Sequence, residues 1–164
     1  MLAIPSLQAQ WFLPFVLPLC LYVAYTDLSR MKITNKSVLA LALIFVVIGF
    51  FLMPFSDYLW RMGALLVVLI MGIILNGAGA MGAGDAKFIA AAAPYIALGD
   101  LRLLMAIFAS MLLAAFVTHR TVRLTPLRQI APNWESWDRK KFPMGFALGP
   151  TLALYLILGA LYGA

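Results

Sequence analysis

Six apolar runs follow one another along this chain of 164 residues, and they constrain its fold more than any other feature. The runs cover about residues 11–26, 38–55, 60–76, 86–98, 101–118 and 142–162. Five of them approach the roughly 20 residues that a helix needs to cross a bilayer. Composition agrees, since 65% of the residues are hydrophobic and only 11% are charged, against about a quarter in soluble domains. The sequence therefore predicts an all-α, polytopic integral membrane protein with about six transmembrane helices.

The fourth run, residues 86–98, is too short to cross a bilayer by itself. At 1.5 Å per residue it covers about 20 Å of a hydrocarbon core that is about 30 Å thick. Irregular backbone is tolerated at membrane depth where it lines a watery cavity. We therefore expect the glycine-rich segment before this run to dip into the membrane, with Asp85 below the surface at the N-terminal end of a helix.

The basic residues predict the orientation of the chain. With six spans, ten Lys and Arg residues fall on one side of the membrane, and only Arg61 and Arg102 fall on the other. Because short loops rich in Lys and Arg stay in the cytoplasm, both termini are expected outside it. Two spans separate Asp27 from Asp85, so both acids are expected at the cytoplasmic face. Topology thus accounts for the net charge of +6, and no nucleic-acid partner is expected.

The length favours one membrane-embedded domain over residues 1–164, without a separate soluble domain. No Lys or Arg precedes the first apolar run, so we expect that run to be a retained span and not a cleaved signal peptide. Cys20 is the single cysteine, which excludes a disulfide or a cysteine-based zinc site within one chain. Asp57 and Asp100 are expected to be solvated on the far side of the membrane.

The stretch from His119 to Lys141 mixes basic residues with Trp134 and Trp137. This mixture is typical of a segment that lies on the membrane surface, and we expect it to contact anionic lipid. We expect His119 itself in a loop, because no second histidine exists to complete a typical metal site.

Asp27 and Asp85 indicate chemistry most strongly. An ionisable side chain at membrane depth is expensive, so its default interpretation is functional. Two neighbouring carboxylates separate their apparent pKa values, which leaves one to take a proton from water and the other to polarise a peptide carbonyl. Such a pair indicates an aspartic protease. Because the pair titrates as a unit, either aspartate can be the base.

Glycines and one lysine surround the second acid. Gly82 and Gly84 permit a tight backbone and let a substrate strand approach the acid closely. Lys87 could hold a carboxylate in its ionised state or bind substrate, and it could equally extend to lipid headgroups. Structural interpretations also exist, since Asp85 could cap a helix and Asp27 could be an ordinary acid at the membrane edge. The occurrence of both acids on one face favours function.

Three motifs follow one another along the chain. Residues 82–85 read Gly-Ala-Gly-Asp, which fits the GxGD motif of intramembrane-type aspartyl proteases. Residues 82–88 resemble the form of this motif in type IV prepilin peptidases. Residues 27–35 resemble the segment that carries the first aspartate of that family, with Thr34 in place of the usual proline. Residues 142–150 resemble the Pro-x-Gly-x-Ala stretch of its last span, so the resemblance covers nearly the whole chain.

The resemblance implies an aspartic endopeptidase of peptidase family A24. Such an enzyme removes the leader peptide of type IV prepilins or pseudopilins at the cytoplasmic face of the bacterial inner (plasma) membrane. The resemblance implies catalytic roles for Asp27 and Asp85, and no cofactor or metal. Larger members carry a cysteine-rich zinc-binding loop and a methyltransferase region, both of which we expect this chain to lack. It is similar to the short, peptidase-only form associated with Flp-type (tight-adherence) pili.

Three other functions stay open, as does the oligomeric state. A small proton-coupled transporter also carries acids within the membrane, but it would distribute them over several depths, whereas Asp27 and Asp85 lie at one edge. A non-catalytic pilus or secretion assembly factor would tolerate Asp85→Asn. A metal-dependent enzyme with both aspartates as Mg²⁺ ligands would be inhibited by chelators.

Overall fold

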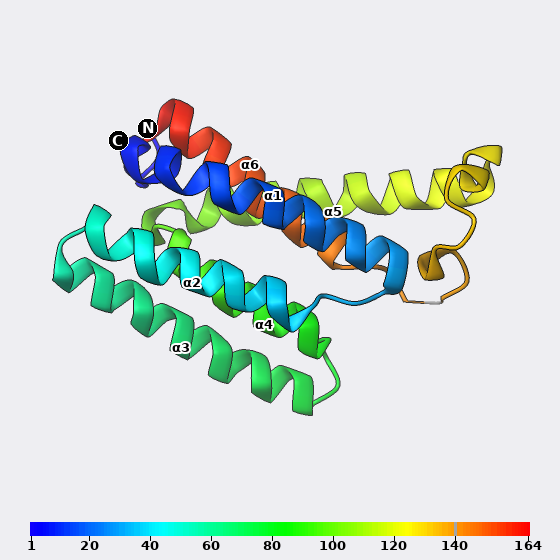
Figure 1. The fold of residues 1–164 in the computed structure, drawn as a ribbon, viewed down its shortest axis with the longest axis horizontal. Helices are drawn as coiled ribbons and strands as arrows, with labels where there is room; N and C mark the ends of the chain where they lie inside the picture. The colour runs from blue at the N-terminus through cyan, green and yellow to red at the C-terminus, as the bar shows by residue number, and fades with distance from the viewer. Residues whose placement is uncertain (140) are drawn as a thin grey trace.

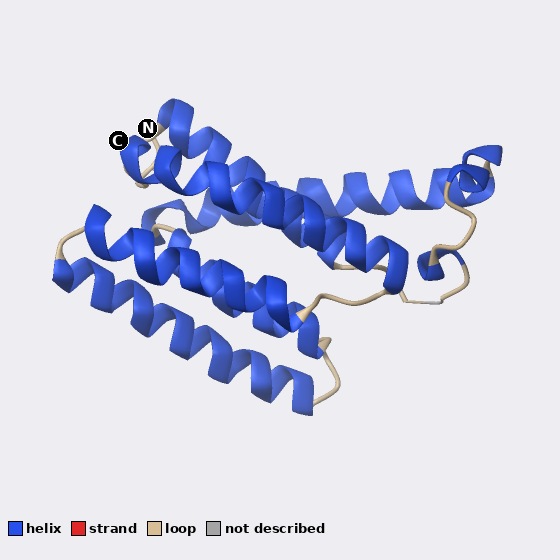
Figure 2. Ribbon diagram, in the orientation of Figure 1, coloured by secondary structure: helices blue, strands red, loops and turns tan. Residues whose placement is uncertain are grey.

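The computed structural model describes residues 1–139 and 141–164, and its regular elements there are all helices (Figure 2). The α-helices are α1 (Ser6–Arg30), α2 (Asn35–Leu52), α3 (Phe55–Gly77), α4 (Ala83–Ala92), α5 (Leu101–Leu124) and α6 (Gly145–Tyr162). Short 3₁₀ helices are η1 (Ala93–Tyr95), η2 (Leu98–Asp100), η3 (Pro126–Ile130) and η4 (Glu135–Trp137). The predicted all-α fold is confirmed.

Every α-helix except α4 is long and apolar enough to cross a membrane. The outer faces of these helices expose large apolar side chains, among them Phe51, Ile74 and Leu113. In α3 the only buried residue is Gly72, and most of the large apolar side chains of that helix are exposed. A contiguous apolar surface of this extent marks a membrane-facing protein. The chain is therefore a multi-pass helical membrane protein.

The fourth apolar run forms a helix of only ten residues, α4, followed by η1 and η2. At 1.5 Å per residue, α4 is about 15 Å long, half the thickness of the hydrocarbon core. Pro94 lies in η1, where its missing N–H cannot continue the α-helical hydrogen bonds. The backbone is therefore irregular on both sides of α4. We had expected irregular backbone only in the glycine-rich segment before the helix.

The most extensive packing between two helices joins α1 to α6, while α4 packs against α2 and α3 (Figure 1). Two glycines of α6 make the contact with α1 close. A Cβ atom on Gly149 would lie 2.5 Å from the carbonyl oxygen of Cys20, and one on Gly145 would lie 3.0 Å from the Cβ atom of Asp27. Two small residues four positions apart on a membrane helix are typical of such a close contact, and it brings the start of α6 to the end of α1.

Both termini lie at one end of the bundle (Figure 1), where Asp100 ties the N-terminal segment down. Its carboxylate accepts hydrogen bonds from the amides of Ala3 (2.7 Å) and Ile4 (3.0 Å) and from the hydroxyl of Tyr155 (2.9 Å). Asp100 is consequently buried, so the expectation that it is solvated was wrong. Asp57, at the same end, is exposed as expected.

Candidate active site

A cavity of about 440 Å³ holds both candidate acids. It lies where α1 ends and α4 begins, at the end of the bundle opposite the termini (Figure 1). Its wall contains every residue that the sequence singled out for the site: Asp27, Gly82, Gly84, Asp85 and Lys87. The rest of the wall consists of Met31, Lys32, Ile33, Asn35, Ala83, Lys141, Phe142 and Met144. The fold thus brings together residues from three separate parts of the sequence.

Asp27 lies in the last turn of α1 and is only 6% exposed. Its Oδ2 accepts a hydrogen bond of 2.6 Å from the backbone N–H of Gly145, the first residue of α6. The first amides of a helix have no partner within the helix, and they bind carboxylates favourably. A side chain at position 145 would crowd this contact, since its Cβ would lie 3.0 Å from Oδ2. The N-terminus of α6 therefore fixes the position of the Asp27 carboxylate.

Asp85 lies half-buried in the first turn of α4. Its carboxylate folds back over Gly82. The two are so close that a Cβ on Gly82 would lie only 2.6 Å from Oδ2 of Asp85. Gly82 itself occupies the N-cap position of the helix, so Asp85 is not the capping residue. Burial raises the pKa of Asp85 above its ordinary value, and the Gly82 backbone amide partly opposes this shift. A larger residue at position 82 would not leave room for this arrangement.

The connection between α1 and α2 closes one side of the cavity. Met31 turns the chain with a left-handed backbone (φ 51°), and Ile33 then packs against the start of α4. A Cβ on Gly84 would lie 3.2 Å from the Cβ of Ile33, so glycine permits this approach. Thr34 caps α2 by accepting a hydrogen bond from the amide of Ser37 at 3.2 Å. The residue that departs from the family pattern thus has a local structural role.

Lys87 is exposed at the rim of the cavity and joins two helices. Its Nζ donates a hydrogen bond of 3.1 Å to Oδ1 of Asn35, the first residue of α2. Asn35 and Gly145 were not predicted to belong to the site. Gly145 lies within the Pro-x-Gly-x-Ala stretch, which was a signal for it. Asn35 is the last residue of the segment 27–35, which resembles the family's first motif and was a signal for it.

The segment after α5 packs beside α1, the helix that carries Asp27. His119 is buried within α5, and its ring stacks on Trp137 with centroids 5.0 Å apart, so the expectation of a loop was wrong. The 3₁₀ helix η4, which holds Trp137, packs against α1. Among the described residues there is no group of three His, Cys, Asp or Glu side chains arranged to hold a metal ion. Lys140, one of the basic residues counted for topology, lies outside the described residues.

Fold and cavity together define a class, the multi-pass helical membrane proteins with two acidic side chains gathered at one end of the bundle. Residues 15–119 match the model of the type IV leader peptidase family, and the chain belongs to that family. The match contains both Asp27 and Asp85 and stops before α6. No curated protein and no solved structure was found to match the chain. Membership in the family makes the chain a type IV leader peptidase-like protease.

Proposed function

We propose that this protein is an aspartic endopeptidase that removes the leader peptide of Flp-type prepilins, with Asp27 and Asp85 as its catalytic pair. The observation that carries the proposal is that α1 and α4 each supply one carboxylate to the same cavity. In a family of peptidases, two acids in one cavity are the groups to which hydrolysis is most simply assigned.

The pair acts with one proton between the two carboxylates. The ionised carboxylate takes a proton from a water molecule, and the water oxygen then bonds to the scissile carbonyl carbon. The protonated carboxylate gives its proton to the carbonyl oxygen, which yields a neutral tetrahedral intermediate. When the C–N bond breaks, the carboxyl group that took the water proton gives it to the leaving nitrogen, and the other carboxylate takes a proton from a hydroxyl of the intermediate as the C=O bond forms again. Each proton taken is given back, and no covalent bond to the protein forms.

Three neighbouring residues support this chemistry. Gly82 and Gly84 keep side chains away from the mouth of the cavity, so an extended peptide can approach Asp85. Lys87 holds the start of α4 against α2 through Asn35, and its remaining donors can bind a peptide carbonyl of the substrate. An extended substrate is required, because a helix hides its scissile bond. The prepilin leader would therefore unwind locally beside Gly82.

We place this site at the cytoplasmic face of the bacterial inner membrane. Lys32, Lys87 and Lys141 line the cavity, in agreement with the excess of basic residues expected on the cytoplasmic side. Both termini then lie outside the cytoplasm. The basic segment that contains η3 and η4 is placed on anionic lipid headgroups, and residues 1–164 act as one membrane-embedded peptidase domain.

The test is cleavage of an Flp-type prepilin co-expressed in cells, read as a shift on a gel. Wild type is compared with Asp27→Asn and Asp85→Asn at matched membrane expression. Asp138→Asn is the control, because it makes the same change at an exposed acid outside the cavity. Loss of cleavage in the first two variants alone supports the pair. Cleavage that survives in either variant removes that acid from catalysis.

The same assay separates the rival functions and the subtype. A prepilin of another type IV class, co-expressed in parallel, is expected to be cleaved less than the Flp-type substrate. If wild type leaves both prepilins uncut while pilus assembly still depends on the protein, the non-catalytic assembly role replaces the peptidase.

A further inference from the structure

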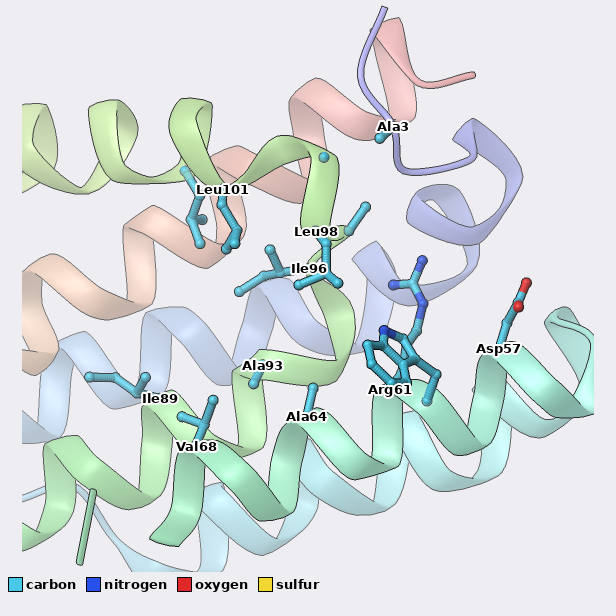
Figure 3. A pocket seen from close by; sticks show the side chains of 14 residues that line it. Ala3, Asp57, Arg61, Ala64, Val68, Ile89, Ala93, Ile96, Leu98 and Leu101 are labelled. Atoms are coloured by element: carbon cyan, nitrogen blue, oxygen red, sulfur yellow. The ribbon is translucent and has the colours of Figure 1, made fainter. Parts of the chain in front are cut away.

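A second cavity, of about 550 Å³, lies away from the acids, near the end of the bundle that holds the termini (Figure 3). Its walls are mostly apolar and come from α3, α4 and the irregular segment that follows α4. We call this cavity the Arg61 groove. It owes its existence to the shortness of α4, because a full-length helix would occupy the space beside α3. None of its lining residues belongs to the cavity of Asp27 and Asp85.

One cation and one anion line the otherwise apolar groove, Arg61 and Asp57. They are four residues apart on α3, which places them on one face of the helix. Their side chains nevertheless form no ion pair, since the ion pairs among the described residues are Arg128–Asp138 and Arg139–Glu135. Figure 3 shows the Asp57 carboxylate directed away from Arg61. Two opposite charges thus stand separately at the groove.

The guanidinium of Arg61 is only partly used by the protein. One nitrogen, Nη1, donates a hydrogen bond of 3.1 Å to the carbonyl of Pro94. Arginine has five N–H donors in a planar fork that matches the oxygens of a phosphate. The other donors of Arg61 have no hydrogen-bond partner in the part of the chain that the structure describes. Charged groups within membrane segments pair with other charges or with backbone carbonyls, and the Pro94 carbonyl accepts from only one of the five donors of Arg61.

The side chain of Arg61 can reach the lipid headgroups from just inside the hydrocarbon core. Arg61 lies six residues after Phe55, where α3 begins, which is about 9 Å along the helix. The helix is about 35 Å long against a core of about 30 Å, so at most about 5 Å of it extends beyond the core, and the backbone of Arg61 lies at least about 4 Å below the core surface. A long arginine side chain covers that distance to the interface. The neighbouring Trp60 is exposed, as is typical of residues at that level. From Arg61 the apolar wall continues inward through Ala64 and Val68.

We propose that the Arg61 groove binds one aminophospholipid, with a phosphatidylethanolamine headgroup. Its phosphate accepts hydrogen bonds from Arg61, its primary ammonium donates to Asp57, and one acyl chain lies along Ala64 and Val68. The charges of this headgroup are opposite to those of the groove, one for one. Phosphatidylglycerol would leave the charge of Asp57 unpaired, because its glycerol headgroup carries no ammonium. A choline headgroup carries no N–H to donate.

The test is native mass spectrometry of the detergent-purified chain, titrated with phosphatidylethanolamine, phosphatidylglycerol and phosphatidylcholine of matched acyl chains. Wild type is expected to bind one phosphatidylethanolamine most tightly. Arg61→Gln and Asp57→Asn should each weaken that binding about tenfold, the effect of losing one charged hydrogen bond. Asp57→Asn should also remove the preference over phosphatidylglycerol. Arg102→Gln is the control, because Arg102 is exposed at the start of α5 and does not line the groove.

A second variant tests the groove without changing its charges. Ala64→Phe fills the space for the acyl chain and should reduce the binding of all three lipids. Equal affinity of wild type for the three headgroups would overturn the proposal, as would an equal loss in Arg102→Gln. A dimer that forms in wild type and is lost in Ala64→Phe, with lipid binding unchanged, would assign the groove to a second copy of the chain and also overturn it.

Discussion

Replacing Gly145 with alanine should slow cleavage of the prepilin severalfold while the protein stays folded. The Cβ of this variant would lie 3.0 Å from both the Cβ and Oδ2 of Asp27, whereas ordinary contacts begin at 3.4 Å. The Asp27 side chain must therefore move by about 0.4 Å, the difference between the two distances. The N–H of residue 145 is unchanged, so the hydrogen bond to Asp27 can persist in a displaced position.

The size of the effect follows from that displacement. A misplacement of 1 Å can cost about a hundredfold in rate. If the logarithm of the rate scales with distance, a shift of about 0.4 Å reduces kcat/KM about sixfold. Overpacking of this kind typically costs about 1–3 kcal/mol of stability. Activity and stability should therefore both fall, and neither should disappear.

The assay is kcat/KM for a purified prepilin in detergent micelles, together with the thermal midpoint of each variant. Gly63→Ala is the matched control, because a Cβ on Gly63 meets nothing within 4 Å. In a helix interior this control should gain up to about 1 kcal/mol of stability and leave kcat/KM unchanged. If kcat/KM of Gly145→Ala equals that of wild type, the reasoning that α6 positions the catalytic carboxylate is refuted.

Three further predictions concern packing, protonation and metal. Gly149→Ala should destabilise the protein by about 1–3 kcal/mol, because its Cβ would lie 2.5 Å from the carbonyl oxygen of Cys20; a thermal midpoint equal to that of wild type would contradict this. Cleavage should follow a bell-shaped pH profile, since the pair needs one proton. Because burial raises the pKa of Asp85, the alkaline limb of the profile should lie above the ordinary aspartate pKa of about 3.9; an alkaline limb at or below that value would show that burial does not act as argued. Excess EDTA should leave the cleavage rate unchanged, and a loss that Mg²⁺ restores would favour the metal-dependent mechanism.

Much of the fold could be predicted from run lengths alone, because a bilayer demands helices of a fixed length. The end of α3 and both limits of α6 fall within three residues of the apolar runs that predicted them, whereas α3 begins at Phe55, five residues before its run. The helix α5 continues to Leu124, beyond its apolar run, since basic side chains at a helix end can extend to the interface. This extension is why His119 lies in a helix and not in a loop.

The burial of Asp100 could not be predicted from the sequence. Charge counting placed it outside the membrane, which suggested solvent. Its partners are the amides of Ala3 and Ile4, nearly a hundred residues away, together with Tyr155. Such partners become visible only once the termini are brought together. An unpaired buried carboxylate is costly, and three donors remove that cost.

The sequence predicted the two acids of the candidate site, but it did not predict the backbone contact that holds Asp27 in position. The motif around Gly82 and the span count indicated that Asp27 and Asp85 lie on one side, and the shared cavity agrees. The amide of Gly145 that holds Asp27 depends on the close packing of α1 and α6. The Pro-x-Gly-x-Ala stretch marked this part of the chain, but it did not show that the amide of Gly145 would bind Asp27.

A double-mutant cycle on the two acids tests the central claim most directly. The values of kcat/KM are measured for wild type, Asp27→Asn, Asp85→Asn and the double variant, all in the same micelles with the same prepilin. Residues that act as one unit are strongly non-additive. Each single variant should lose on the order of 10³-fold, and the double variant should be no slower than the slower single one. If the two losses multiply in the double variant, or if either single variant keeps wild-type activity, the two aspartates do not act as a pair.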